Sequence, residues 1–119
     1  TALMDAAAKG HEQVVELLIR HGAEINLQTS NGYTALSCAT HQGHERVVDL
    51  LLQRGAKINQ QNSGGSTALL LAAGNGHERV VELLLRHGAE INLQNSIGAT
   101  ALMLAAANNH PTVVLRLLR

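Results

Sequence analysis

Apolar and polar positions divide the first 33 residues of the chain into three stretches. Residues 2–8 are mostly alanine and leucine, which favours a short helix. Residues 12–20 carry their apolar side chains as a broad stripe between Val14 and Ile19, as expected for a second helix that buries one side. Residues 23–33 are polar and rich in Asn, Gly and Ser. They predict a connection built from turns.

Signals for the start and end of each helix agree with this reading. Thr1 stands directly before the first helix, where its hydroxyl can accept a hydrogen bond from the first turn. Gly10 and Gly22 follow the two helices, and glycine adopts the left-handed conformation that commonly ends a helix. The pattern therefore predicts two short helices followed by a polar loop.

The same pattern returns every 33 residues. The tripeptide Thr-Ala-Leu begins at Thr1, Thr34, Thr67 and Thr100. Residues 1–33 and 67–99 are identical at 24 of 33 positions. We therefore divide one domain, residues 1–119, into units 1–33, 34–66, 67–99 and 100–119. No unit can bury its apolar stripe alone, so the units are expected to stack as a solenoid.

These motifs resemble the ankyrin repeat over all 119 residues. The resemblance rests on the 33-residue period, the Thr-x-Leu-x-x-Ala opening, and the Gly-His, Val-Val-x-Leu-Leu and Gly-Ala-x-Ile-Asn motifs. It implies an all-α repeat solenoid of four helix-turn-helix units, the last truncated, with short β-hairpin-like fingers between units. The stack would be concave along the fingers and first helices.

The sequence departs from that family in two respects. The usual Thr-Pro-Leu-His opening is Thr-Ala-Leu-Met at residues 1–4, and the usual acidic residue near each finger tip is Thr29, Asn62 or Asn95. The side-chain network between fingers is therefore in question, although Asn and Thr can make local turn bonds.

Asp5 and Arg116 replace apolar or small residues of the other units, and we expect them to face outward as polar caps.

Charge and cysteine content exclude several classes of protein. Nine basic and nine acidic residues give zero net charge, which argues against a nucleic-acid partner. One cysteine, Cys38, excludes an internal disulfide framework. No apolar run reaches the roughly 18 residues that a membrane span needs, so we expect no membrane insertion. We expect a monomeric, intracellular chain, in the cytoplasm or nucleus. It begins without Met and is interpreted as a segment of a longer protein.

The histidines and Cys38 do not form a predicted catalytic or metal site. The four repeated histidines would lie one layer apart, roughly 8–10 Å, which is too far for ligands that need about 2 Å to zinc. We interpret them as bonding their own loop backbone. His21 and His87 are interpreted as caps of their helices, and Cys38 as a small core residue. The repeated histidines are His11, His44, His77 and His110. The sequence predicts a non-catalytic chain without metal or cofactor.

Binding remains as the predicted function, because a rigid stack offers an extended surface. In the family that the chain resembles, variable positions of the fingers and first helices line the recognition face for a partner protein or peptide. The finger positions here are Asn31, Tyr33, Gly64, Ser66, Ile97 and Ala99. The positions at the ends of the first helices are Lys9, His41, Gln42, Asn75 and Asn108. An alternative is a structural spacer or self-assembling scaffold, natural or engineered, without a specific ligand there.

The resemblance also implies a modification, because ankyrin repeats are substrates of an intracellular asparaginyl hydroxylase. The target pattern of Leu, five residues, an acidic residue, an aliphatic residue and Asn ends at Asn26 and at Asn92, whereas Lys57 breaks it before Asn59. We expect Asn26 to be modified first, because a terminal unit has only one neighbour. The alternative is that these asparagines serve only to bond the finger backbone.

Overall fold

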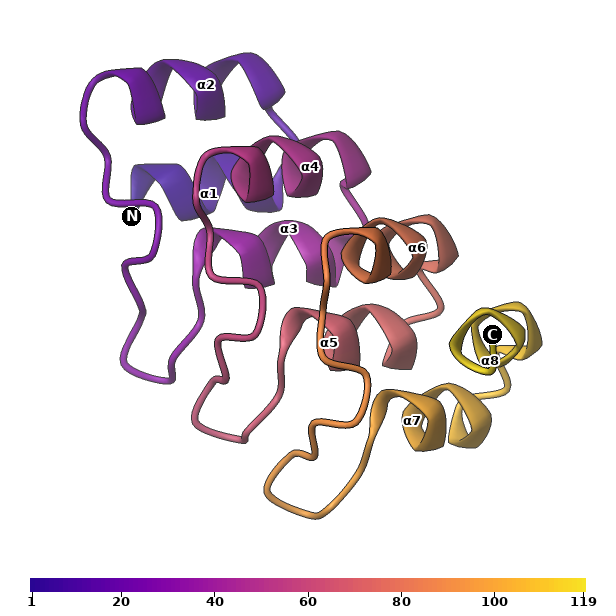
Figure 1. The fold of residues 1–119 in the computed structure, drawn as a ribbon. Helices are drawn as coiled ribbons and strands as arrows, with labels where there is room; N and C mark the ends of the chain where they lie inside the picture. The colour runs from indigo at the N-terminus through magenta and orange to yellow at the C-terminus, as the bar shows by residue number, and fades with distance from the viewer.

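The computed structural model describes all of residues 1–119 and consists of eight helices without strands (Figure 1). The first helices of the four units are α1 (Ala2–Ala8), α3 (Ala35–Gln42), α5 (Ala68–Gly74) and α7 (Ala101–Ala107). The second helices are α2 (Glu12–Arg20), α4 (Glu45–Gln53), α6 (Glu78–Arg86) and α8 (Pro111–Leu117). The helices α1 and α2 have the limits that the sequence predicts.

The helices form two rows, and the units follow one another along the stack (Figure 1). Each first helix packs against the next one, and each second helix does the same. The chain ends lie at opposite ends of an elongated molecule of 40 × 26 × 21 Å. The predicted all-α repeat solenoid is confirmed. None of its helices is long and apolar enough to span a membrane.

Each first helix begins at its threonine. The Thr1 hydroxyl accepts a hydrogen bond from the Met4 amide at 3.1 Å, and Thr67 and Thr100 make the equivalent bond. At Thr34 the bond is reciprocal, because the Ser37 hydroxyl in turn accepts from the Thr34 amide. These caps satisfy amides that have no partner within the helix.

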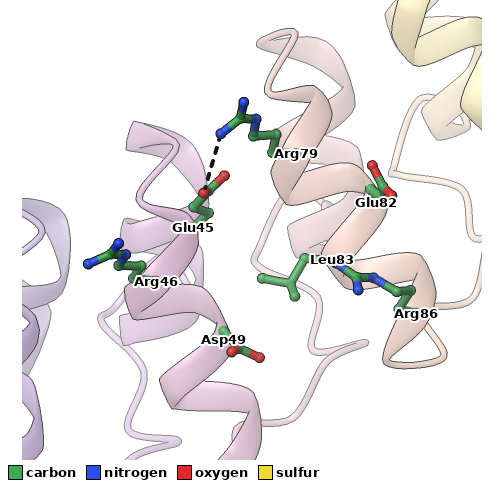
Figure 2. Close-up of a pocket in the computed structure, with 7 residues that line it drawn as sticks. All are labelled: Glu45, Arg46, Asp49, Arg79, Glu82, Leu83 and Arg86. Atoms are coloured by element: carbon green, nitrogen blue, oxygen red, sulfur yellow. Dashed lines mark ion pairs between the residues drawn. The ribbon is translucent and has the colours of Figure 1, made fainter.

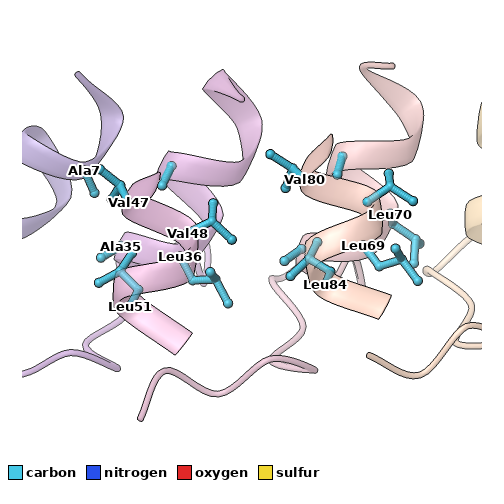
Figure 3. Close-up of a cluster of buried hydrophobic side chains, with 14 of the residues drawn as sticks. Ala7, Ala35, Leu36, Val47, Val48, Leu51, Leu69, Leu70, Val80 and Leu84 are labelled. Carbon is cyan, nitrogen blue, oxygen red and sulfur yellow. The ribbon is translucent and has the colours of Figure 1, made fainter. Parts of the chain in front are cut away.

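The core lies between neighbouring units. The second valine of each Val-Val pair is fully buried in the first three units, and Leu51 and Leu84 are equally buried. Figure 3 shows Val48, Leu51 and Leu84 among these buried side chains, together with Ala35 and Leu69. Every unit therefore completes the apolar core of its neighbours.

The fingers, residues 23–33, 56–66 and 89–99, are closed by hydrogen bonds but contain no strand. The Asn62 amide donates to the Ser66 carbonyl at 3.0 Å, and the other two fingers make the same contact. The Asn62 side chain also accepts from the amides of Gly64 and Ser66. The local turn bonds expected of the neutral finger residues are confirmed.

Other asparagines, at the bases of the fingers, connect one finger to the next. Asn26 accepts through Oδ1 from the Lys57 amide at 2.9 Å and donates through Nδ2 to the Gly55 carbonyl at 3.2 Å. Asn59 accepts from the Glu90 amide at 3.0 Å. The fingers thus have a side-chain network, and its members stand three residues before the positions where the family carries its acid.

Three of the four repeated histidines bond a neighbouring unit through their rings, and our interpretation that they bond their own loop is wrong. His44 Nε2 donates to the Ala8 carbonyl at 2.9 Å, and His77 Nε2 donates to the His41 carbonyl at 2.9 Å. The ring lies over the glycine that ends the preceding first helix, where a Cβ on Gly43 would stand 2.8 Å from His77 Nδ1. His44, His77 and His110 therefore each fasten their unit to the one before it.

The two expected end caps behave differently. Asp5 is exposed at the N-terminal end of the stack. Arg116 instead turns back along the stack, where its Nη1 lies 2.7 Å from Glu82 Oε2. The expectation that Arg116 faces outward is therefore wrong, because the acidic side chain on α6 lies within reach and provides a better partner than the open end.

Candidate partner-binding surface

The predicted finger residues form two rows along the stack. Asn31, Gly64 and Ile97 lie at the finger tips and are exposed, and Ile97 is 83% exposed. Tyr33, Ser66 and Ala99 lie where each finger returns to the next first helix, and they are half-buried. A backbone hydrogen bond joins successive tips, from the Ser63 amide to the Asn31 carbonyl and from the Ser96 amide to the Gly64 carbonyl. The tips are thereby held at fixed spacing.

The predicted residues at the ends of the first helices form another row. Lys9, His41, Gln42, Asn75 and Asn108 are all exposed. Asn75 Nδ2 lies 3.3 Å from His41 Nδ1, so the amide donates to the imidazole, and Asn108 Nδ2 donates to the Gly74 carbonyl at 3.0 Å. These bonds cross from one unit to the next and hold the side chains in place before any partner arrives.

The surface formed by these rows is almost uncharged. Lys9 is the one formally charged residue among the predicted set when histidine is neutral. The fingers project beside the row of first helices (Figure 1). Such a surface offers exposed amide groups, one half-buried tyrosine and one isolated apolar side chain. Its chemistry allows hydrogen bonds and apolar contacts but offers little electrostatic attraction.

Most of the charged residues of the chain lie on the second helices. Figure 2 shows a groove between α4 and α6 in which arginines and acidic side chains alternate around Leu83. Its Glu45 and Arg79 lie 3.8 Å apart. The groove is lined by Glu45, Arg46, Asp49, Arg79, Glu82, Leu83 and Arg86. Because acids and bases neutralise one another here, the groove presents no strong field of one sign.

Ion pairs on this side connect successive units in a regular way that our sequence reasoning missed. Glu16 pairs with Arg54 at 2.5 Å, and Asp49 with His87 at 3.2 Å. In both pairs the base stands 38 residues after the acid. The signal in the sequence is the recurrence of an acid in the second helices of units 1 to 3, Glu16, Asp49 and Glu82, with a base directly after the second helix of units 2 and 3. His21 caps its own helix as expected, by bonding the Leu17 carbonyl.

The structure contains no group of three or more His, Cys, Asp or Glu side chains placed to hold a metal ion. Cys38 is half-buried. Burial raises the pKa of its thiol, the N-terminal ammonium lowers it, and nearby Asp5 raises it further. The net effect keeps the thiol protonated, which is the opposite of what activates a cysteine nucleophile.

Comparison with known proteins agrees with the stacked architecture. A family model described as ankyrin repeats in three copies matches residues 1–62 and again residues 57–119. A search of the curated proteins found no match. Ankyrin repeats are generally protein–protein interaction modules and are typically non-catalytic. The two matches together cover the whole stack of helix pairs with its capping threonines and fingers, and the chain belongs to the ankyrin repeat family.

Proposed function

We propose that this chain binds a partner protein or peptide on the concave face formed by the fingers and first helices. The observation that carries the proposal is Ile97, an apolar side chain that is 83% exposed at a finger tip. Its counterparts at the other two tips are Asn31 and Gly64, so the repeat itself does not require an apolar residue there. Covering this side chain with a partner would remove its apolar area from water.

The chemistry of the surface defines the kind of partner. Apart from Lys9 it is formally uncharged, so a partner would not be selected by its net charge. The exposed Asn31, Gln42 and Asn75 offer amide groups that can both donate and accept hydrogen bonds. The partner that fits is a polypeptide with an apolar side chain for Ile97 and backbone polar groups for the amides. A nucleic acid does not fit, because the surface lacks a basic patch.

The rigidity of the surface supports the same proposal. The finger tips are joined by backbone hydrogen bonds, and the helix-end row by bonds such as Asn108 to Gly74. A surface that is already ordered loses little conformational entropy on binding. We propose further that the chain acts without catalysis, cofactor or metal, as a monomer when it binds its partner. We place it in the cytoplasm or nucleus, where its single unpaired cysteine would remain reduced.

The test compares Ile97→Ala with Leu17→Ala. Both residues are exposed and apolar, at 83% and 54%, but Leu17 lies on α2, outside the proposed surface. The tagged chain is used to capture proteins from cell extract, and a captured protein is then purified and titrated against each variant. We expect Ile97→Ala to weaken binding by at least about fivefold, roughly 1 kcal/mol, and Leu17→Ala to leave it unchanged.

Hydrogen exchange on the complex locates the contact independently. Protection should increase at the tips of the fingers and at the ends of the first helices. Protection confined to the second helices, with equal affinity for wild type and Ile97→Ala, would contradict the proposal and point to the charged groove of Figure 2 instead.

A further inference from the structure

Two dipeptides of the chain join an asparagine directly to a glycine, Asn31-Gly32 and Asn75-Gly76. In such a pair the glycine amide nitrogen can approach the side-chain Cγ of the asparagine, because glycine has no side chain to obstruct it. Both groups belong to one molecule, which favours their reaction with each other. The structure places the two asparagines in different surroundings, and this difference decides which of them reacts.

The Asn31 side chain is bonded in a way that activates its carbonyl carbon. The Thr29 hydroxyl donates to Asn31 Oδ1 at 2.6 Å and accepts from the Tyr33 amide at 3.0 Å. The bond that the hydroxyl accepts strengthens the bond that it donates. The hydroxyl can therefore stabilise negative charge that develops on Oδ1. No hydrogen bond holds Nδ2 of this side chain, so the atom that must leave is free.

The Asn75 side chain is held in the opposite way. It lies at the end of α5, where its Nδ2 donates to the Leu71 carbonyl at 2.9 Å and lies 3.3 Å from His41 Nδ1. No group donates to its Oδ1. The glycine that follows packs against the His110 ring, since a Cβ on Gly76 would stand 2.6 Å from that ring. The contacts of Asn75 thus retain the leaving group and leave the oxygen without support.

The exposure of Asn31 belongs to the finger tip and not to the place where the sequence begins. Gly64, at the same position in unit 2, has a finger on either side and is also exposed. A preceding finger touches the two residues before the tip, as Gly32 shows by packing against Asn62 and Ser63. A finger placed before unit 1 would therefore leave the Asn31 side chain accessible to water.

We propose that Asn31 deamidates spontaneously in the folded chain, with water as the only co-reactant. The Gly32 amide first leaves its 2.9 Å bond to the Thr29 carbonyl, which is a local opening of the tip. Its nitrogen loses a proton to solvent and attacks Asn31 Cγ, and the Thr29 hydroxyl stabilises the charge on Oδ1. The Cγ–Nδ2 bond then breaks. Nδ2 takes up a proton and leaves as ammonia, and a five-membered succinimide ring remains.

Water opens the succinimide at one of its two carbonyl carbons. Attack at Cγ gives aspartate. Attack at the main-chain carbonyl carbon gives isoaspartate, in which the main chain runs through Cγ. By either route one amide and one water become one carboxylate and one ammonium ion, without oxidation or reduction.

Both products change the finger tip. The Asn31 carbonyl accepts from the amide and from the hydroxyl of Ser63, each at 3.0 Å, and the additional main-chain carbon of isoaspartate displaces that carbonyl. Both products also place a carboxylate on the proposed partner surface, where Lys9 carries the only formal charge. The effect on binding rests on the proposed function, whereas the reaction itself does not.

The experiment follows the folded chain at mildly alkaline pH by peptide mass spectrometry, with fragmentation that distinguishes aspartate from isoaspartate. A synthetic peptide of residues 27–36 serves as the reference for an unfolded Asn-Gly pair. We expect Asn31 to be converted at least about tenfold faster than Asn75 in the folded chain. In concentrated urea the two rates should become similar, because both sets of contacts are lost.

Variants of Thr29 test the hydroxyl. Thr29→Asp can still accept from the Tyr33 amide, as the native hydroxyl does, but cannot donate to Asn31. Thr29→Val removes the donor without adding charge. Each should slow the deamidation of Asn31 by at least about fivefold, the value of one hydrogen bond, while circular dichroism confirms that the helices are kept. Asn31→Gln should remain unmodified, because its longer side chain would have to form a six-membered ring.

An Asn31 that stays intact in the folded chain while the reference peptide is fully converted overturns the proposal. So does an Asn75 that reacts as fast as Asn31 before urea is added. Equal rates for the wild type and both Thr29 variants would overturn the role given to the hydroxyl.

The consequence for binding is measured separately, by titrating a captured and purified partner with fresh chain, aged chain and Asn31→Asp. The aged chain and Asn31→Asp should bind at least about fivefold more weakly, because the new carboxylate must lose water at the interface. If all three bound equally, the position of the proposed partner surface would be contradicted, while the conversion of Asn31 seen by mass spectrometry would stand.

Discussion

Val80 and Val14 occupy the same position in units 3 and 1, but their surroundings differ completely. Val80 is 1% exposed and packs into the junction with unit 2, whereas Val14 is 45% exposed at the end of the stack. The sequences around them are nearly the same, Glu-Arg-Val-Val against Glu-Gln-Val-Val. The difference therefore comes from the neighbouring unit and not from the residue or its helix.

This comparison shows where the stability of the molecule resides. A helix of seven to nine residues is marginal in water by itself, so each unit depends on the core that it shares with adjacent units. Inner units share two junctions and terminal units share one. Free energy in such a stack is close to a sum over units and junctions, and a substitution should cost most where it disturbs two junctions.

Truncation of a leucine in the second helix should separate inner from terminal units most clearly. Leu84 is fully buried in unit 3, and its counterpart in unit 1, Leu18, is only partly buried. We expect Leu84→Ala to lower the free energy of unfolding by about 2–5 kcal/mol through the cavity it leaves, and Leu18→Ala to cost less than half of that. Urea denaturation followed by circular dichroism measures both. Equal losses of unfolding free energy would contradict the expectation that an inner unit depends more on its neighbours than a terminal unit does.

A methyl group added at a glycine should distinguish a junction from a free loop. Gly43 and Gly55 both have positive φ, at +77° and +98°, but a Cβ at Gly43 would meet the His77 ring whereas nothing lies within 4 Å of one at Gly55. Gly55→Ala should cost about 1–2 kcal/mol from the backbone alone. Gly43→Ala should cost about 1 kcal/mol more, because it also displaces the ring from its bond to the His41 carbonyl.

Thermal and urea unfolding of the two alanine variants gives the difference directly. His77→Ala supplies the control, since removing the ring should reduce the additional cost at position 43 and leave the cost at position 55 unchanged. If Gly43→Ala and Gly55→Ala lowered the free energy of unfolding equally, the contact with the His77 ring would add nothing to the cost of Gly43→Ala.

Local features of the fold could be predicted from the sequence because they depend on neighbouring residues in the chain. The threonine before each first helix and the glycine after it, replaced in unit 4 by Asn109, define that helix, and α1 and α2 begin and end as predicted. The repeat then implies stacking, since identical apolar stripes cannot be buried within one unit. Candidate surface residues could be placed for the same reason, as positions that vary within a constant frame.

Contacts between side chains of different units could not be predicted in the same way. The His44 ring reaches the Ala8 carbonyl, 36 residues away, and the direction of that ring depends on how closely the layers approach. Arg116 turns toward Glu82, although it stands at a position that is leucine in every other unit. Both outcomes depend on the rotation of one helix relative to the next, which the period alone does not specify.

Removal of a helix cap should have a smaller effect that again depends on the unit. Thr67 is 1% exposed and caps α5, whereas Thr1 is exposed and caps α1. Thr67→Ala should cost about 0.5–2 kcal/mol, and Thr1→Ala less, because water can replace the lost hydroxyl at the open end. Thr67→Ser, which keeps the hydroxyl, serves as the control in urea denaturation. If Thr1→Ala lowered the free energy of unfolding as much as Thr67→Ala does, the expected difference between a terminal and an inner cap would be contradicted.

The asparagines at the bases of the fingers also differ between units, and this difference bears on their hydroxylation. That modification remains a proposal. Asn26 makes two hydrogen bonds to unit 2 and Asn59 makes one to unit 3, whereas the exposed side chain of Asn92 makes none. A hydroxylase must withdraw the side chain from such contacts, and each bond adds about 0.5–1.5 kcal/mol to the opening. These contacts reverse the order expected from the position of unit 1 alone, and Asn92 should now precede Asn26.

Mass spectrometry of peptides distinguishes the two orders after incubation of the chain with an asparaginyl hydroxylase, iron and 2-oxoglutarate. We expect added oxygen first at Asn92, then at Asn26, and least at Asn59, where Lys57 replaces the acidic residue of the target pattern. Lys57→Glu provides the control, because it supplies that residue while Asn59 keeps its single bond to the Glu90 amide. Asn59 in this variant should then be modified faster than Asn26, which must break two bonds. If Asn26 were instead modified first in both chains, opening of the terminal unit would outweigh the hydrogen bonds of the individual side chain.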